Sequence, residues 1–298
     1  MTGALSGKTI LMSGGSRGIG LAIALRAARD GANVALLAKT GDAHPALEGT
    51  VHSAAAAIEA AGGRALAHVG DVRNDVDVER AVSDTVAHFG GLDIVVNNAS
   101  AIDARPTTTI TMKAYDLLQD VNCRGTFLLS KTAIPHLAKS ANPHILTLSP
   151  PINLDPQWAG ASLAYTLSKY GMSLCTLGLA HELRDLGIAV NSLWPRTYVA
   201  TAAVALIGGS ELASRSRTPE IMADAAYAIL SRSAGGCTGR FYLDEDALEE
   251  YGVHDLRPYS VEPGATLEPA FFLDGATALG SLRPDATASS REQDRPRP

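Results

Sequence analysis

The stretch TILMSGGSRGIG, residues 9–20, joins a short apolar run to a glycine-rich turn and then to the start of a helical pattern. Glycines let the backbone turn tightly and approach a diphosphate, and the helix that follows provides unpaired N–H groups and a partial positive charge. The spacing Gly14-x3-Gly18-x-Gly20 departs from the G-x-G-x-x-G form of dinucleotide-binding turns. The stretch predicts a nucleotide site after the first strand, with a tight turn that binds no ligand as the alternative.

The same alternation of apolar runs and helical patterns continues along the chain. Apolar residues recur at helical spacing in GLAIALRAARD (20–30), SAAAAIEAAG (53–62) and DVERAVSDTVAHFG (77–90). Nearly continuous apolar strands separated by helices predict a parallel α/β sheet with helices on both faces. The seven expected strands are 9–13, 34–38, 65–69, 93–98, 144–149, 189–194 and 240–244.

Composition and net charge limit which classes of protein and which partners are expected. The 298 residues are 46% hydrophobic and 19% charged, with a formal charge of −6, which gives no reason to expect a nucleic-acid or membrane partner. Three scattered cysteines are too few for a disulfide framework or a metal cluster, so no metal is expected. No apolar run reaches the ~18 residues of a membrane span. Because the N-terminal segment also lacks a cleavage-type pattern, we expect a cytoplasmic protein.

The C-terminal part of the chain changes character. We expect one domain over residues 1–280, with a C-terminal extension that starts at about residue 245. Within it, VEPGATLEPAFFLD (261–274) carries an apolar FFLD sequence that is expected to pack back on the domain. Residues 281–298 are polar and rich in proline and charge, which predicts a disordered tail.

The end of the second strand indicates which dinucleotide the chain prefers. An acid that meets a free ribose 2′-OH is expected roughly 20 residues after the glycines. Counting from Gly18 leads to Ala38 and Lys39, so no acid stands there, and Arg17 with Lys39 could bracket a 2′-phosphate instead. This pattern favours NADP(H) over NAD(H). Two solvated cations are the alternative, and Asp42 is close enough in sequence to compete for Lys39.

Two further polar turns follow predicted strands, GDV (70–72) after the third and NNAS (97–100) after the fourth. Both fall at the carboxyl edge of a parallel sheet, where open α/β folds bind ligands. Asp71 could accept a hydrogen bond from an adenine amino group, and the backbone of Asn97 and Ala99 could face the ribose.

The sequence AYTLSKYG (164–171) places Tyr165 and Lys169 one helical turn apart, so both side chains lie on one face. A free tyrosine has a pKa near 10, and an ammonium one turn away favours the phenolate and lowers that pKa. Tyr165 is then the candidate general acid/base, and Lys169 is expected to contact the nicotinamide ribose as well. Tyr170 is the better candidate for ordinary packing.

Two more polar residues complete the candidate catalytic set. Ser149 ends the fifth strand and is expected to hydrogen-bond the substrate oxygen. Asn122 falls within a long helical pattern, where asparagine is unfavourable, so it indicates a local irregularity with a purpose. We expect Asn122 to hold a water molecule that passes the proton to solvent.

The combined pattern resembles the short-chain dehydrogenase/reductase family over roughly residues 5–245. This resemblance implies a doubly wound Rossmann sheet of strand order 3-2-1-4-5-6-7 and a homodimer or homotetramer. The matching motifs are SGGSRGIG, NNAS, Asn122, Ser149 and the Tyr165-x3-Lys169 pair. The expected cofactor-binding residues are Gly14, Ser16, Arg17, Gly18, Ile19, Gly20, Lys39, Asp71, Val72, Asn98, Ala99, Tyr165, Lys169, Pro195, Thr197 and Thr201.

Several positions depart from the family pattern. The usual Pro-Gly after the sixth strand reads Pro195-Arg196, which would place Arg196 near the nicotinamide, the pyrophosphate or an acidic substrate group. The threonine expected to clamp the diphosphate stands one place late as Thr201, with Thr197 as a competitor. Ser149 also precedes the tyrosine by sixteen positions, more than usual, in a loop rich in proline.

These residues predict an NADP(H)-dependent oxidoreductase that interconverts an alcohol and its carbonyl, with an apolar small-molecule substrate. A lid is expected over TAAVALIGGSELASR (201–215), whose glycines allow movement. An enoyl-thioester reductase of the same fold and a non-catalytic NADP(H) sensor are the alternatives.

Overall fold

Seven parallel strands form the central sheet in the order β3-β2-β1-β4-β5-β6-β7, which confirms the predicted Rossmann topology. The computed structural model describes residues 3–43 and 49–276, so the tail expected at 281–298 lies outside the described residues. All seven expected strands are present. They are β1 (Thr9–Ser13), β2 (Asn33–Ala38), β3 (Arg64–Val69), β4 (Ile94–Asn97), β5 (His144–Thr147), β6 (Ala189–Trp194) and β7 (Phe241–Leu243).

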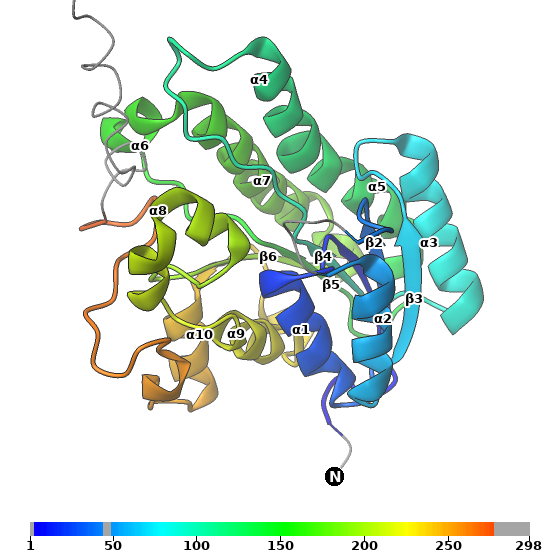
Figure 1. Ribbon diagram of the computed structural model, residues 1–298. Helices are drawn as coiled ribbons and strands as arrows, with labels where there is room; N and C mark the ends of the chain where they lie inside the picture. Colours follow the sequence, from blue (N-terminus) through cyan, green and yellow to red (C-terminus); the bar gives the residue numbers. More distant parts are fainter. Residues whose placement is uncertain (1–2, 44–48, 277–298) are drawn as a thin grey trace, which may run out of the picture.

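Helices cover both faces of the sheet (Figure 1). One face is covered by α1 (Gly18–Ala28), α2 (Val51–Ala60), α9 (Glu220–Leu230) and α10 (Asp244–Tyr251). The other face is covered by α3 (Asp75–Phe89), α5 (Gly125–Leu137) and α7 (Leu163–Glu182). The remaining helices are α4 (Met112–Leu118), α6 (Pro156–Ala161), α8 (Ala202–Ser214), the π-helix η1 (Gln119–Arg124) and the short 3₁₀ turns η2 (Arg184–Leu186), η3 (Ala234–Gly236) and η4 (Arg257–Tyr259).

The strands are apolar on both sides because each face of the sheet has its own core. Along β1, Ile10 and Met12 are buried against the α1 side, whereas Leu11 between them is buried against the α3 side. Leu11 lies in register with Ala35 of β2 and Val95 of β4. Continuous apolar runs, and not alternating ones, are what this two-sided burial requires.

Helices α2 and α3 begin about two residues before the apolar patterns at 53–62 and 77–90 predicted. Thr50 caps α2 by accepting a hydrogen bond from the Ser53 N–H, and Asn74 caps α3 in the same way. Capping residues stand before the first apolar position, so an apolar pattern alone places a helix start too late.

The C-terminal extension returns to the carboxyl edge of the sheet. Residues 268–274, here called the C-terminal strap, pair with the loop that follows β6. The Tyr198 N–H donates to the Glu268 carbonyl at 3.0 Å, and the Ala270 N–H donates to the Arg196 carbonyl at 3.0 Å. Among the residues that the structure describes, no helix is both long and apolar enough to cross a membrane.

Candidate active site

The glycine-rich turn joins β1 to α1 with a backbone that other residues could not readily adopt. Gly14 and Gly18 have positive φ values of 77° and 57°. A Cβ on Gly14 would lie 2.6 Å from the Asn98 Nδ2 atom, and that amide itself donates to the Ser13 carbonyl. At the start of α1, the N-cap residue Arg17 makes no side-chain capping bond, so its side chain leaves the first N–H groups of the helix uncapped. The turn therefore has the form of an anion-binding cradle.

A cleft of about 540 Å³ opens over this turn at the carboxyl edge of the sheet. Gly20 lies outside it, buried within α1, where a Cβ would lie 2.7 Å from the Gly15 Cα atom. The structure thus brings together most of the residues that the sequence assigned to a cofactor. Those that line the cleft are Gly14, Ser16, Arg17, Gly18, Ile19, Lys39, Asp71, Val72, Asn98, Ala99 and Thr201.

Two cations stand where the sequence predicted a 2′-phosphate site. The Arg17 guanidinium donates to the Gly49 carbonyl at 2.7 Å, and the Lys39 ammonium lies 3.5 Å from the Asp71 carboxylate. Asp71, and not Asp42, is therefore the acidic partner of Lys39. The Lys39 side chain is 61% exposed, so this exposed pair holds it only weakly.

Asp71 is held as an anion by its own neighbour. The Arg73 guanidinium bonds the Asp71 carboxylate and lowers the pKa of that carboxyl to about 2. The charge on Asp71 therefore persists at neutral pH.

Tyr165 and Lys169 lie in the first turns of α7 and face a second cavity, of about 190 Å³. Ile19, Asn98 and Thr201 line both this cavity and the larger cleft, so the two spaces adjoin. The second cavity, here called the substrate cavity, is predominantly apolar. Its lining residues include Ile102, Leu148, Trp194, Pro195, Tyr198, Val199, Val204, Ile207, Met222 and Phe271.

Burial dominates the protonation of the tyrosine–lysine pair. It raises the pKa of Tyr165 well above the ordinary value of 10 and lowers the pKa of Lys169 to about 7. The Lys169 ammonium donates to the Leu148 carbonyl at 2.7 Å and lies 5.0 Å from the Trp194 ring centroid. Burial alone accounts for the direction in which the Tyr165 pKa moves, so the lowering expected from Lys169 is not found in this arrangement.

Ser149 is not brought to the substrate cavity. Its side chain is fully buried, and its hydroxyl is hydrogen-bonded to the Ser192 hydroxyl at 2.8 Å, which donates in turn to Thr176. Ser149 is absent from the described linings of both the cleft and the substrate cavity. In this arrangement the Ser149 hydroxyl joins β5 to β6 and α7 through hydrogen bonds, and its contact with a substrate oxygen stays a prediction.

Asn122 lies in the π-helix η1, so the predicted irregularity is present. Its amide oxygen accepts from the Ala101 N–H at 2.7 Å, and its amide nitrogen donates to the Ala101 carbonyl and to the Ser168 hydroxyl, both at 2.9 Å. The Ser168 hydroxyl donates to the Tyr165 carbonyl at 2.8 Å. Asn122 therefore ties the loop after β4 to the turn of α7 that carries Tyr165, while its contact with a water molecule stays a prediction.

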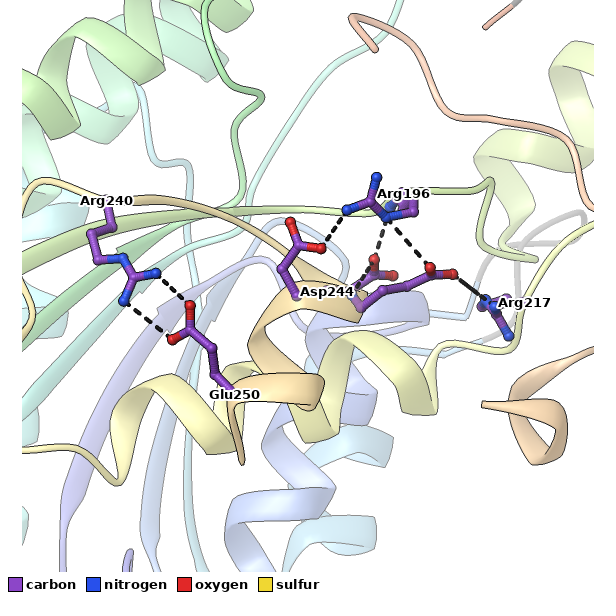
Figure 2. Close-up of polar contacts among 7 residues, drawn as sticks. Arg196, Arg217, Arg240, Asp244 and Glu250 are labelled. Carbon is purple, nitrogen blue, oxygen red and sulfur yellow. Dashed lines mark hydrogen bonds and ion pairs between the residues drawn. The ribbon is translucent and has the colours of Figure 1, made fainter. Parts of the chain in front are cut away.

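Contrary to expectation, Arg196 is absent from the described linings of both cavities, and its side chain lies among the acidic residues of α10 (Figure 2). Its guanidinium pairs with Asp246 and lies 3.4 Å from the Glu245 carboxylate, both on α10. Its backbone N–H donates to the buried Asp244 carboxylate at 2.8 Å, as Figure 2 shows. The acidic residues of α10 thus provide the ion-pair partners of Arg196.

Thr201 and Thr197, the two candidates for contact with the diphosphate, have different surroundings. Thr201 lines the cleft and caps α8, whereas Thr197 is buried and pairs with Pro269 of the C-terminal strap. Helix α8 also breaks at Gly209, where φ is 65°, whereas the movement expected of this segment as a lid stays a prediction. Trp194, Tyr198 and Ile102 were not predicted as lining residues, because their apolar rings and side chains resemble ordinary core positions in sequence.

Comparison with known proteins decides the family. The sequence pattern described as short chain dehydrogenase matches residues 8–208. The chain belongs to the short-chain dehydrogenase family. As a member, it is an oxidoreductase of a family that uses a nicotinamide cofactor, and the glycine cradle with its adjoining cleft fits such a dinucleotide.

This short-chain dehydrogenase is 56% identical over 274 residues to hydroxysteroid dehydrogenase-like protein 2 of Danio rerio. The match covers 92% of the chain but 66% of the relative, so the chain spans about two thirds of that protein's length. A crystal structure of a putative dehydrogenase from Xanthomonas campestris has a TM-score of 0.88 at 55% identity, covering 91% of this chain and 99% of that one.

A more distant structure carries a bound dinucleotide. The NADH-dependent reductase A1-R′ complexed with NAD has a TM-score of 0.67 at 26% identity, covering 82% of this chain and 97% of that one.

Proposed function

We propose that this short-chain dehydrogenase interconverts an alcohol and its carbonyl with NADP(H), and that Tyr165 exchanges the proton. The observation that carries the proposal is the position of Tyr165 and Lys169 in a cavity that adjoins the glycine-rich cleft. A dinucleotide laid along the cleft from the cradle would bring its reactive end toward the phenol. A bound nicotinamide would supply the hydride.

The residues of the chain then handle the proton and the geometry. Because burial keeps the Tyr165 phenol protonated, it can donate to a carbonyl oxygen that gains negative charge during reduction, and the phenolate takes the proton back in the reverse reaction. Lys169, anchored on the Leu148 carbonyl, would contact the ribose and help to stabilise the negative charge. Asn122 would keep the α7 turn in place through Ser168.

Arg17 and Lys39 support a preference for NADP(H). Both line the cleft beside the end of β2, and that end carries no acid for a free 2′-hydroxyl. A 2′-phosphate would add a strong anion that the partly exposed Lys39 could bind in place of its weak contact with Asp71. The distant reductase complexed with NAD shows that this fold also accommodates the other dinucleotide, so the preference requires a direct test.

A homodimer or homotetramer in the cytoplasm is part of the same proposal. Helices α5 and α7 expose several large apolar side chains, among them Phe127, Leu167, Leu174 and Leu177, each about half exposed. Such a patch on two neighbouring helices is typical of a symmetric interface. Light scattering would test the state of assembly.

The function is tested by a turnover screen after fluorescence titration with NADPH and NADH. We expect NADPH to bind at least tenfold more tightly, about 1.4 kcal/mol, and we expect oxidation of NADPH with ketones or aldehydes. Turnover of enoyl thioesters alone would favour the enoyl reductase, and binding without any turnover would favour the sensor. Tighter binding of NADH would overturn the roles given to Arg17 and Lys39.

A further inference from the structure

The C-terminal strap (residues 268–274) is fastened to the substrate cavity by side chains as well as by backbone. The Trp194 indole N–H donates to the Phe271 carbonyl at 2.9 Å, and the Asn153 amide donates to the Phe272 carbonyl at 3.3 Å. Trp194 itself lines the cavity, whereas Asn153 belongs to the proline-rich loop after β5. The strap is thus tied both to a residue of the cavity lining and to the loop after β5.

Phe272 anchors the strap at the cost of backbone strain. Among the residues that the structure describes, it alone combines a side chain with a positive φ, at 70°. Its ring is buried, with centroid distances of 5.2–6.2 Å to the rings of Trp158, Tyr165, Tyr170 and Trp194. A strained backbone persists where surrounding contacts determine it, and such positions concentrate at ligand sites.

The preceding residue, Phe271, turns into the substrate cavity. Its ring lies edge-on to Tyr198 at 5.1 Å between centroids, and both residues line the cavity with Tyr165. The phenyl ring therefore stands in the wall that a substrate held at Tyr165 would meet. Because the strap is fixed on both sides, this wall cannot move aside freely.

The charged groups around the substrate cavity indicate which substrates it can accept. In the described lining, the cation is Lys169, whose ammonium is engaged by the Leu148 carbonyl. Arg196, the other cation close in sequence, is held by the acids of α10. An anionic group beside Phe271 would lose its hydration there without gaining an ionic partner.

We propose that the C-terminal strap forms a wall of the substrate site, that Phe271 limits the size of the group next to the reacting carbonyl, and that this group is small, apolar and uncharged. The inference rests on the proposed carbonyl chemistry, and it names the substrate class within it. Phe271 is thus a specificity-determining residue, and Phe272 is the residue that positions it.

The test compares the wild type with Phe271→Ala in NADPH-dependent reduction. Its substrates are the best carbonyl compound from the screen and homologues lengthened by one to four methylene groups. We expect the variant to raise kcat/KM for the longest homologue, relative to the parent, at least tenfold, since one methylene in an apolar pocket alters kcat/KM by roughly 10–200-fold. Phe89→Ala, the same change on α3 outside the cavity lining, should leave this ratio unchanged. Phe271→Leu serves if the alanine variant does not fold.

The outcomes separate the two proposals. If the size preference is unchanged in the Phe271 variants while Tyr165→Phe abolishes turnover, the strap inference is overturned and the proposed function stands. If Tyr165→Phe turns over like the wild type, the proposed function fails and the inference falls with it. A further arm uses homologues that end in a carboxylate: the wild type should reduce them at least 100-fold less efficiently, and equal efficiency would contradict an uncharged pocket.

Discussion

At the scale of single residues, the site contains groups that folding alone would not favour. Lys169 is buried at 2% exposure, and burial lowers its pKa to about 7 from an ordinary value of 10.5. Burial of Tyr165, one turn away, raises the pKa of its phenol, which therefore stays neutral at pH 7. The buried Lys169 ammonium weakens the fold at neutral pH, which is expected of a residue kept for chemistry.

Lys169→Met tests this cost. The folded pKa of Lys169 is lowered, so its destabilisation is fully present at and below pH 7 and is lost as the pH rises toward 10.5. Removing the buried ammonium should stabilise the fold by about 1.4 kcal/mol for each pH unit by which burial lowers the Lys169 pKa. Losing the hydrogen bond to the Leu148 carbonyl should cost about 1 kcal/mol. We therefore expect the variant to be more stable than the wild type at pH 6–7. We expect its turnover to fall about 100-fold or more. Urea unfolding at pH 6.5 and 10 measures the difference, and a variant that is less stable at pH 6.5 would contradict this account.

Residue type and spacing predicted that Tyr165 and Lys169 share a helix face, because an i,i+4 pair needs no tertiary information to do so. The direction of Ser149 could not be predicted in that way. Its hydroxyl faces Ser192, 43 positions later, and only the packing of β6 beside β5 reveals that partner. The same holds for Arg196, whose partners on α10 lie about fifty positions downstream.

At the scale of elements, the start of α10 acts as a clamp on the loop after β6. Asp244 is fully buried, and its carboxylate accepts from the N–H groups of Arg196 and Glu245, both at 2.8 Å. Burial raises the pKa of Asp244 to about 7, although the two N–H donors and the nearby Arg217 oppose the shift. This clamp fixes the loop that pairs with the C-terminal strap.

Asp244→Asn removes the titration while it keeps an oxygen acceptor. Because the folded pKa lies above the ordinary value of 3.8, the folded state binds the proton more tightly, so wild-type stability falls as the pH rises from about 4 to 7. We expect the variant to gain stability relative to the wild type across that window, by up to about 1.4 kcal/mol per pH unit. Guanidinium unfolding at pH 5 and pH 8 measures this, and parallel behaviour of the two proteins would contradict it.

At the scale of the whole molecule, the sheet order places every binding element at one edge. The ends of β1, β4, β5 and β6 bring the glycine turn, the NNAS turn, the loop before α7 and the loop before α8 around one cleft. Continuous apolar runs separated by helical patterns were sufficient to predict the strands and the fold class. The strap was only partly predictable, because FFLD indicates burial but not which surface it covers.

The most direct test of the central claim is Tyr165→Phe, measured as carbonyl reduction under saturating NADPH together with NADPH binding. The substitution removes one oxygen and leaves the ring against Phe272 in place. The account predicts a kcat lowered by about 10²–10⁴-fold, with NADPH affinity unchanged within threefold. A variant whose kcat stays within threefold of the wild type would contradict proton transfer by this phenol.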